Sequence, residues 1–269
     1  MKSRITHSTG WRPDLPDQRD YLYSASEHHS VERSKSLPPS VNLSTSPHMP
    51  PIADQGQLGS CTAFATCAAF DYLDSVSGQP FLAPSHLFQY WNSRALEHTT
   101  SEDSGASIRD AIKVTGSIGM CAETMWPYDI AKFRTRPPKP CFAAAHGYEV
   151  SQYLRVDSTN PTELRTCLAA GFPIVFGATI FQSFEQPGPN ARGEIPMPKK
   201  TEKVLGGHAQ LIVGYDDIRK MFLVRNSWGT SWGINGYEWM PYAYLTNLNL
   251  ADDFWTLRAL QSAKAKRAA

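Results

Sequence analysis

The chain has 269 residues with a net charge of +1, and 19% of its residues are charged. That length suits one large domain or two lobes that share an interface. No apolar run approaches the ~20 residues that span a bilayer, and no long basic tract marks a nucleic-acid-binding protein. We therefore expect a soluble globular protein without a membrane or nucleic-acid partner.

The first half of the sequence favours helices. Residues 1–36 are polar and irregular and do not form an independent domain. Beyond them, amphipathic or apolar stretches start with Ser or Pro near the first turn, as helices commonly do. These patterns predict helices over 61–75, 84–96, 107–114 and 161–170.

In the second half of the sequence, apolar residues follow the two-residue period that is typical of β-strands. "PIVFGATI", "HAQLIVGY" and "MFLVRNSW" are rich in β-branched and aromatic residues and are separated by Gly, Pro and Asp. This composition predicts an antiparallel sheet. Helices followed by strands indicate an α+β fold, which we expect to have two lobes with a cleft between them.

The five cysteines are odd in number and scattered, and none forms a CxxC pair. We interpret them as mostly reduced thiols, and we expect no metal and no cofactor. The N-terminus "MKSRITHSTGWRPD" lacks the apolar core of ~7–15 residues found in secretory signals. These features favour a cytoplasmic protein, with export by a non-standard route left open.

One cysteine has an unusual position. In "QGQLGSC", Ser60 is a natural N-cap, so Cys61 falls in the first turn of a largely apolar helix. Unpaired N–H groups and the helix dipole favour an anion there, which predicts a thiol pKa below the free value of ~8.5. Cys67 lies outside the field of the helix N-terminus, and we expect it to be part of the hydrophobic core. Because a cysteine at a helix start is often structural, a catalytic role also requires a base and oxyanion donors.

His208 is the candidate base. It follows two glycines, which leave room for another backbone, and it opens a predicted strand. A hairpin centred near Ile218 places His208 opposite Trp228 and diagonal to Asn226 on one face of the sheet. An amide oxygen can accept the ring N–H of a histidine, and Trp228 can shield that bond from water.

The blocks "QGQLGSC", "GGHAQLIVGYDD" and "VRNSWGTSWGINGYEW" together resemble the papain-like cysteine peptidases (peptidase family C1), most closely the bacterial members. The spacing agrees: 147 residues (208 − 61) separate the cysteine from the histidine, and 18 (226 − 208) separate the histidine from the asparagine. The resemblance covers 37–255. It implies a papain-like fold with a mainly helical lobe at about 55–165, an antiparallel, β-barrel-like lobe at about 166–255, and a tail at 256–269.

The resemblance also implies roles for individual residues. Cys61 would be the nucleophile, His208 the general base and later acid, and Asn226 the residue that orients it. Gln55 would form the oxyanion hole together with the Cys61 backbone N–H. The family pattern departs here at Leu58, which is usually cysteine, and at Thr62, which is usually aromatic. The substrate-binding candidates are Gly59, Gly105, Ala106, Gly207 and Trp228.

We expect thiol-dependent hydrolysis of peptides or proteins through an acyl-enzyme, carried out by a monomer. Two alternatives stay open. The same residues could pass an acyl group to an amine, as an acyltransferase or transglutaminase-like enzyme does, or the chain could be an inactive, peptidase-like binding module.

The extension at 1–36 is shorter than a family prosegment but contains several aromatic residues. Our hypothesis is that it lies on the body of the protein and partly covers the cleft, with Trp11, Leu15, Tyr21 and Tyr23 as anchors. A purely structural clasp and a disordered tail are the alternatives.

Overall fold

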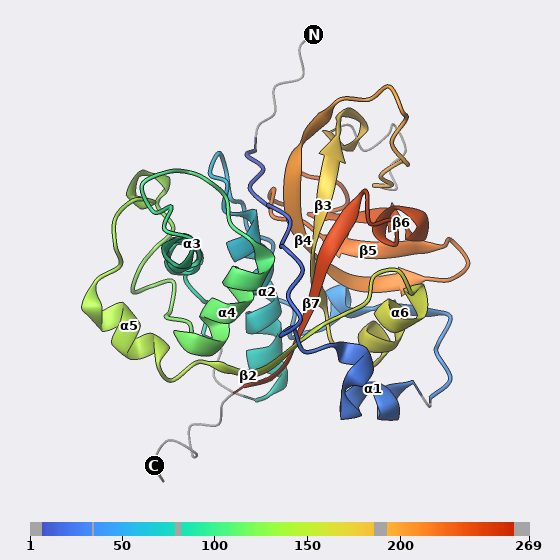
Figure 1. Cartoon of the computed structure of the whole chain (residues 1–269), viewed down its shortest axis with the longest axis horizontal. Helices are drawn as coiled ribbons and strands as arrows, with labels where there is room; N and C mark the ends of the chain where they lie inside the picture. Colours follow the sequence, from blue (N-terminus) through green and yellow to red (C-terminus); the bar gives the residue numbers. More distant parts are fainter. Residues whose placement is uncertain (1–6, 34, 79–81, 186–192, 261–269) are drawn as a thin grey trace.

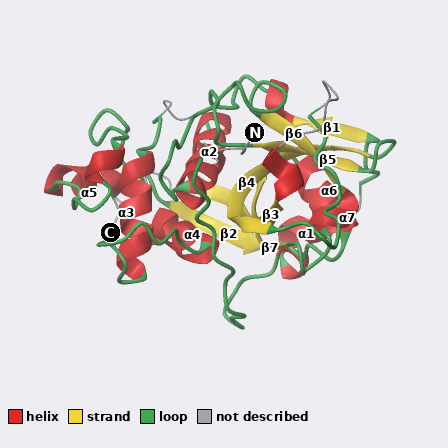
Figure 2. Cartoon of the chain, turned by 90° about the horizontal axis from the view of Figure 1, so that it is seen from above, coloured by secondary structure: helices red, strands yellow, loops and turns green. Residues whose placement is uncertain are grey.

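The computed structural model describes residues 7–33, 35–78, 82–185 and 193–260. Most of the helices lie on one side of the molecule and the sheet on the other, and the N-terminal stretch runs between them (Figures 1 and 2). The α-helices are α1 (Glu27–Glu32), α2 (Cys61–Val76), α3 (His86–Leu96), α4 (Ile108–Ser117), α5 (Lys139–Ala145), α6 (Pro161–Ala169) and α7 (Tyr242–Leu245). Short 3-10 helices cover Tyr23–Ala25, Leu43–Thr45, Ile130–Lys132 and Gln182–Glu185.

Within the described residues the strands form one seven-stranded sheet with the order β2-β7-β3-β4-β5-β6, and β1 pairs with β4 off this path. Every pairing is antiparallel, as predicted. The α+β class is thus confirmed. The strands are β1 (Ser40–Asn42), β2 (Val150–Arg155), β3 (Ile174–Phe181), β4 (Val204–Asp216), β5 (Met221–Arg225), β6 (Tyr237–Pro241) and β7 (Ala251–Leu260).

The four predicted helices are all present, and side-chain caps set three of their starts. The hydroxyl of Ser85 accepts from the backbone N–H of Phe88 at 3.1 Å, so α3 begins at His86, two residues later than predicted. The Ser107 hydroxyl caps α4 in the same way. At α6 the Asn160 side chain is the cap, and Pro161 takes the first helical position.

Several elements were not predicted. Helices α1 and α5 are short, and β2 is polar in sequence and lies within the stretch assigned to the helical lobe. Strand β7 continues to Leu260, five residues into the predicted tail. Strand β4 begins at Val204, not at His208, because Gly206 and Gly207 pair with β3 and do not interrupt the strand. Residues 1–6, 34 and 261–269 of the predicted extension and tail lie outside the described residues.

Helix α2 is buried on all sides from Cys61 to Asp74. One face packs on α3 and α4, and another packs on the sheet through Leu211, Val213 and Trp255. A second core on the far face of the sheet includes Phe176, Phe222 and Phe254. A helix enclosed in this way cannot shift without opening the core, so the position of its first residue is well defined.

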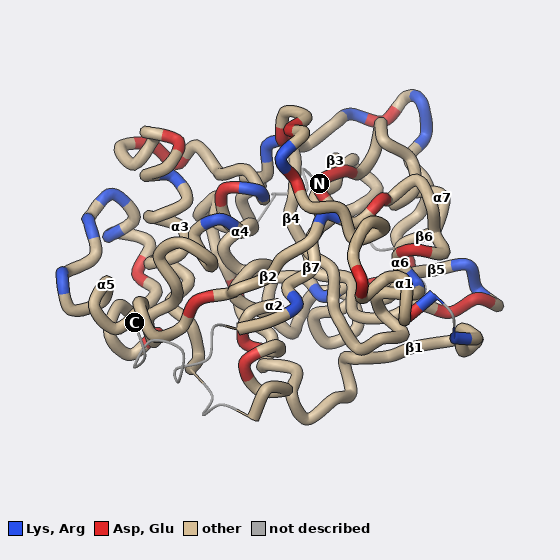
Figure 3. The backbone as a smooth tube through the Cα atoms, turned by 60° about the horizontal axis from the view of Figure 1, so that its bottom comes forward, with Lys and Arg blue, Asp and Glu red and all other residues tan. Residues whose placement is uncertain are grey.

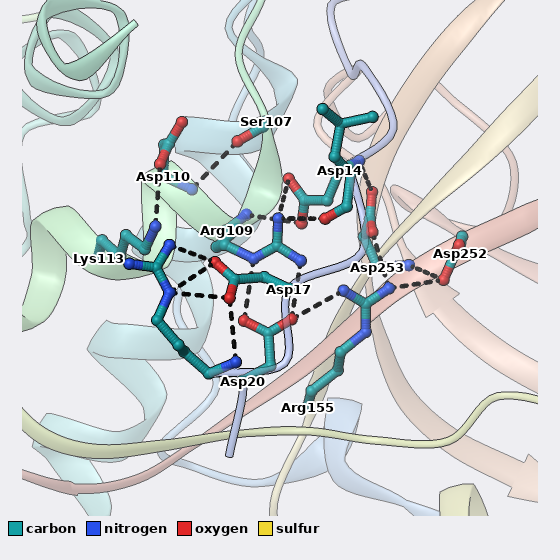
Figure 4. Close-up of polar contacts among 12 residues, drawn as sticks. Asp14, Asp17, Asp20, Ser107, Arg109, Asp110, Lys113, Arg155, Asp252 and Asp253 are labelled. Atoms are coloured by element: carbon teal, nitrogen blue, oxygen red, sulfur yellow. Dashed lines mark hydrogen bonds and ion pairs between the residues drawn. The ribbon is translucent and has the colours of Figure 1, made fainter. Parts of the chain in front are cut away.

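Lys and Arg alternate with Asp and Glu along the chain on both sides of the molecule (Figure 3). Several acidic residues and two arginines also gather in the interior, where the N-terminal stretch passes between α4 and β7 (Figure 4). Charges buried at such a place require partners, and they bear on how the N-terminal stretch is held.

Candidate active site

Cys61 is the first residue of α2 and is fully buried. Ser60 occupies the N-cap position as predicted, but its side chain makes no capping bond. The Ser60 hydroxyl instead lies 2.7 Å from the hydroxyl of Tyr128. The first N–H groups of the helix therefore have no acceptor in the Ser60 side chain. The backbone N–H of Thr62 acts on the Cys61 sulfur and favours its thiolate form.

Burial raises the pKa of Cys61 to about 11, although backbone N–H groups of Ala209, Gly10, Thr62 and Trp11 act in the opposite direction. The prediction of a lowered pKa is thus wrong for this structure. Desolvation of the thiolate outweighs the field of the helix terminus. Two of the donors, Gly10 and Trp11, belong to the N-terminal stretch, so the environment of the thiol depends on a segment about 50 residues away in sequence.

His208 lies on β4, fully buried, with its Nε2 atom 2.9 Å from Asn226 Oδ1. This confirms the predicted proximity of the two side chains. Near the site β4 and β5 pair in the predicted register, with Leu211 opposite Arg225, and the register shifts by one residue beyond Ile212. The backbone of Ala209, the neighbour of His208, makes the largest contribution among the backbone groups that favour the thiolate of Cys61. The structure thus brings His208 of β4 and Asn226 beyond β5 together, and places the backbone next to His208 against the Cys61 sulfur at the start of α2.

Burial lowers the pKa of His208 to about 4, while its hydrogen bond with Asn226 has the opposite effect. The other ring nitrogen, Nδ1, is buried and has no hydrogen-bond partner among the described residues. At neutral pH the ring is accordingly uncharged in this structure, and Nδ1 is the nitrogen left to take up a proton.

Trp228 covers the histidine. Its ring stacks on that of His208 with centroids 4.7 Å apart, and it is 5% exposed. The ring of His7 stacks on Trp228 at 5.3 Å, and His7 Nε2 lies 3.0 Å from Asp54 Oδ1. The predicted shielding position of Trp228 is therefore observed, with a residue of the N-terminal stretch stacked on it as well.

Gln55 is fully buried, and its amide is oriented by three hydrogen bonds. Its Oε1 atom accepts from the Ser227 hydroxyl at 2.6 Å. Its Nε2 atom donates to the backbone oxygens of Leu58 and Ser8, both at 2.9 Å. The side chain predicted to donate to an oxyanion thus donates to a peptide carbonyl, that of Ser8.

We define the N-terminal segment as residues 7–23. It makes backbone hydrogen bonds at two of the predicted substrate-binding residues. Ala106 N–H donates to Gly10 O at 2.9 Å, and Trp11 N–H donates to Gly207 O at 2.9 Å. Trp11 pairs with Ala106 as a parallel bridge. A Cβ atom on Gly10 would lie 2.0 Å from Gly59 O, so the close approach requires glycine.

The remaining glycine candidates have different surroundings. Gly59 donates its N–H to both carboxylate oxygens of Asp103, at 3.0 and 3.1 Å, so this donor is used within the protein. Gly105 adopts φ +67°, and a Cβ atom there would meet the backbone of Gly10. Gly105 therefore allows close contact with the backbone of Gly10, and Gly59 has no backbone N–H free for a substrate.

Trp11 fills a pocket in the sheet lobe and is 6% exposed. Its ring lies on Gly177, where a Cβ atom would come within 2.0 Å, and its Nε1 atom donates to Asp253 Oδ2 at 3.0 Å. Of the other anchors proposed from sequence, Tyr23 is fully buried, but Leu15 and Tyr21 are 82% and 76% exposed. The prediction was wrong for these two, because the chain between Trp11 and Tyr23 is held by charged groups.

These charged groups join the N-terminal segment to both sides of the molecule (Figure 4). Arg109 of α4 donates to Asp20 through Nε at 3.0 Å and Nη2 at 2.7 Å, and its backbone N–H donates to Asp14 at 3.2 Å. Arg155 of β2 lies 3.1 Å from Asp20 and 3.1 Å from Asp253. Breaking a pair buried to this degree is costly, because it leaves a charge without compensation.

All five cysteines are free. No group of three or more His, Cys, Asp or Glu side chains able to hold a metal ion occurs within 7–33, 35–78, 82–185 and 193–260. Among the helices of the same ranges, none has the length and apolar character needed to cross a membrane.

Sequence reasoning missed one buried acid beside the site. Glu238 of β6 is fully buried, and it accepts hydrogen bonds from the side chains of Asn226, Gln210 and Trp232. The available signal was an acidic residue between aromatic residues in "GYEWM". The contacts of His7 and Ser8 had no comparable signal, since both residues lie in a polar stretch.

The profile of the family described as "Papain family cysteine protease" matches residues 37–253. Xylellain, a cysteine protease from Xylella fastidiosa, has a solved structure that is 39% identical, with a TM-score of 0.85 over 97% of this chain and 99% of that one. The peptidase C1-like protein L477 of Acanthamoeba polyphaga mimivirus is 37% identical over 95% of this chain and 88% of its own length. Procathepsin L of Felis catus is 28% identical over 75% of this chain and 60% of its own length. The chain therefore belongs to the papain family of cysteine proteases.

Proposed function

We propose that the chain hydrolyses peptide bonds through an acyl-enzyme at Cys61. His208 takes the proton of the Cys61 thiol, the sulfur attacks the scissile carbonyl carbon, and a thioester forms as the amine leaves with that proton. A water molecule, deprotonated by His208, then attacks the thioester and releases the acid. Asn226 orients the imidazole, while Gln55 and the Cys61 backbone N–H donate to the developing oxyanion.

The contact between Gln55 and Ser8 is the observation that carries this proposal. A peptide carbonyl already accepts a hydrogen bond from Gln55 Nε2 at 2.9 Å. The backbone two residues further on, at Gly10, lies close enough to the Cys61 sulfur to favour its thiolate form. A site that holds an extended peptide against its thiol and its amide donor has the geometry that acyl transfer from a peptide requires.

Removal of the N-terminal segment would change the charges in the site. With the segment in place, burial keeps Cys61 as a thiol and His208 as a neutral ring, with pKa values of about 11 and about 4. Admitting water lowers the desolvation cost of both ions. The thiolate and imidazolium then stabilise each other, and this ion pair is the reactive form.

Covalent labelling tests the proposed nucleophile. A peptide epoxide or vinyl sulfone is expected to add once per chain, and mass spectrometry of the digested protein should place the adduct on Cys61. An adduct confined to another cysteine would contradict the assignment.

Product analysis with an added amine separates hydrolysis from the acyltransferase alternative, because amide products would replace the free acid.

Gln55→Ala is expected to lower kcat about 10²-fold with a smaller change in KM, because one of two oxyanion donors is lost and the Cys61 backbone N–H remains. Steady-state hydrolysis of a short fluorogenic peptide measures the effect. The matched control is Gln57→Ala, an exposed glutamine two residues further on, which should retain wild-type kcat. An unchanged kcat in a folded Gln55→Ala protein would remove Gln55 from the mechanism.

We propose further that the N-terminal segment covers the substrate site in cis. Three observations support this. The segment bonds to Gln55, Ala106 and Gly207, and its Trp11 is buried in the same hydrophobic cluster as Cys61. In addition, Cys61 and His208 are both 0% exposed beneath it. A free substrate has to displace the segment before it can reach the sulfur. The rate is therefore limited by the fraction of molecules in the open form, in which the segment is displaced, as opposed to the closed form, in which it covers the site.

A further inference from the structure

We propose that Glu238 is a positioning residue for the catalytic histidine and acts through Asn226. The inference rests on the proposed function and extends the row of catalytic side chains by one member. In this row the imidazole of His208 contacts the amide of Asn226, and that amide contacts the carboxyl group of Glu238. Glu238 touches no substrate, so its effect on the reaction passes entirely through the amide.

The contacts of Asn226 define the row. Its Oδ1 atom lies 2.9 Å from His208 Nε2 and accepts from the Ser227 backbone N–H at 2.7 Å. Its Nδ2 atom is 3.3 Å from each of the two carboxyl oxygens of Glu238. Every polar atom of the amide thus has a partner in a place that water does not reach.

Only one orientation of the amide satisfies these partners. If the amide turned over, Nδ2 would face the N–H of Ser227, and two donors would meet. Oδ1 would then face the carboxyl group of Glu238, and two acceptors would meet whenever that group is ionised. Glu238 therefore opposes the orientation in which Asn226 cannot accept the N–H of His208.

Glu238 itself is held firmly. Strand pairing places it opposite Val224, two residues before Asn226. Trp232 Nε1 donates to its Oε2 at 2.7 Å, and Gln210 Nε2 donates to its Oε1. With Asn226 this makes three N–H donors directed at one carboxyl group, an arrangement that suits an acceptor-only carboxylate.

The charge of Glu238 should affect the pKa of His208, which can be measured. Burial raises the pKa of Glu238 to about 8, and the three N–H donors act in the opposite direction. Above about pH 8 the group is a carboxylate, which makes the Asn226 oxygen a stronger acceptor and favours the imidazolium form of His208. Loss of this carboxylate should lower the pKa at which the imidazolium loses its proton.

The test uses Glu238→Gln in the full chain, with kinetics of peptide hydrolysis and of Cys61 alkylation measured across pH. We expect kcat to fall about tenfold with KM within about twofold, which is the pattern of a residue that acts on the transition state alone. The upper pKa of the pH–rate profile should fall by about half a unit to one unit. The matched control is Glu163→Gln, a second buried carboxylate on α6, a helix that contacts β3 and β4, and it should leave both readouts unchanged.

A double-mutant cycle separates positioning from general damage. In an Asn226→Ala background, Glu238→Gln should cause no further loss in the Cys61 alkylation rate, because the amide through which it acts is absent. Full, multiplicative losses in both backgrounds would overturn the proposal, as would an unchanged kcat and pH profile in folded Glu238→Gln. Either result leaves the proposed function intact, since that depends on Cys61-dependent cleavage by the wild type.

If Glu238→Gln does not fold, Gln210→Met provides the same test. It removes one donor from the carboxyl group and keeps the volume of the side chain close to that of glutamine. The expected loss is two- to threefold in kcat, again only where Asn226 is present. A loss of equal size in the Asn226→Ala background would overturn the proposal.

Discussion

Cys61→Ser is expected to lower kcat for peptide hydrolysis by at least about 10⁴-fold, because the variant lacks the sulfur that forms the thioester. A serine hydroxyl ionises far less readily than a thiol, and an Asn-oriented imidazole does not compensate for the difference. The measurement is steady-state cleavage of a fluorogenic peptide, combined with labelling by a peptide epoxide, which should no longer modify the protein.

Cys67→Ala is the matched control for this variant. Cys67 lies in the same helix and is also buried, but it has no part in the proposed mechanism. We expect its activity to stay within about threefold of wild type, with at most a modest loss of stability from the removed sulfur. Wild-type turnover in a folded Cys61→Ser protein would remove Cys61 from the mechanism, whereas the absence of turnover in both the wild type and the variant would favour the inactive binding module.

Trp11→Ala is expected to raise kcat/KM for a short peptide by about 10²-fold. The indole is 6% exposed in its pocket and donates to Asp253. Truncating a buried tryptophan typically costs about 3–5 kcal/mol, and here the cost falls on the closed form alone. A bias of this size against the closed form shifts the population toward the open form by two orders of magnitude or more. The rate of Cys61 alkylation should rise in parallel.

Leu15→Ala is the control within the same segment. Leu15 is 82% exposed, so its removal should leave both the peptidase rate and the alkylation rate unchanged. Intact-mass measurement before and after the assay distinguishes displacement of the segment from its cleavage. If folded Trp11→Ala showed the same activity and labelling rate as wild type, the segment would be a structural clasp and not a cover.

Features that depend on neighbouring residues were accessible from the sequence. The start of α2 at Cys61 follows from the small, polar residues before an apolar stretch. The meeting of His208 with Asn226 follows from a hairpin whose centre could be located near Ile218. Both depend on local periodicity and turn length, which are readable in a single chain.

Features that depend on distant partners were not accessible. The polar strand β2 carries no strong strand pattern and exists because β7 pairs with it. Leu15 and Tyr21 looked like anchors by residue type, yet Arg109 and Arg155 hold that stretch through Asp20. An ion pair across the molecule leaves no local signal in the sequence.

The sequence by itself determined which side chains could carry the chemistry and in what order the chain presents them. The tertiary structure decided their charge states and what lies over them. Cys61 was expected to be an easily ionised thiol from its helix position, but the N-terminal segment buries it, and its pKa rises to about 11. The physical reason is that a helix terminus is a local property, whereas desolvation depends on every group that packs above the sulfur.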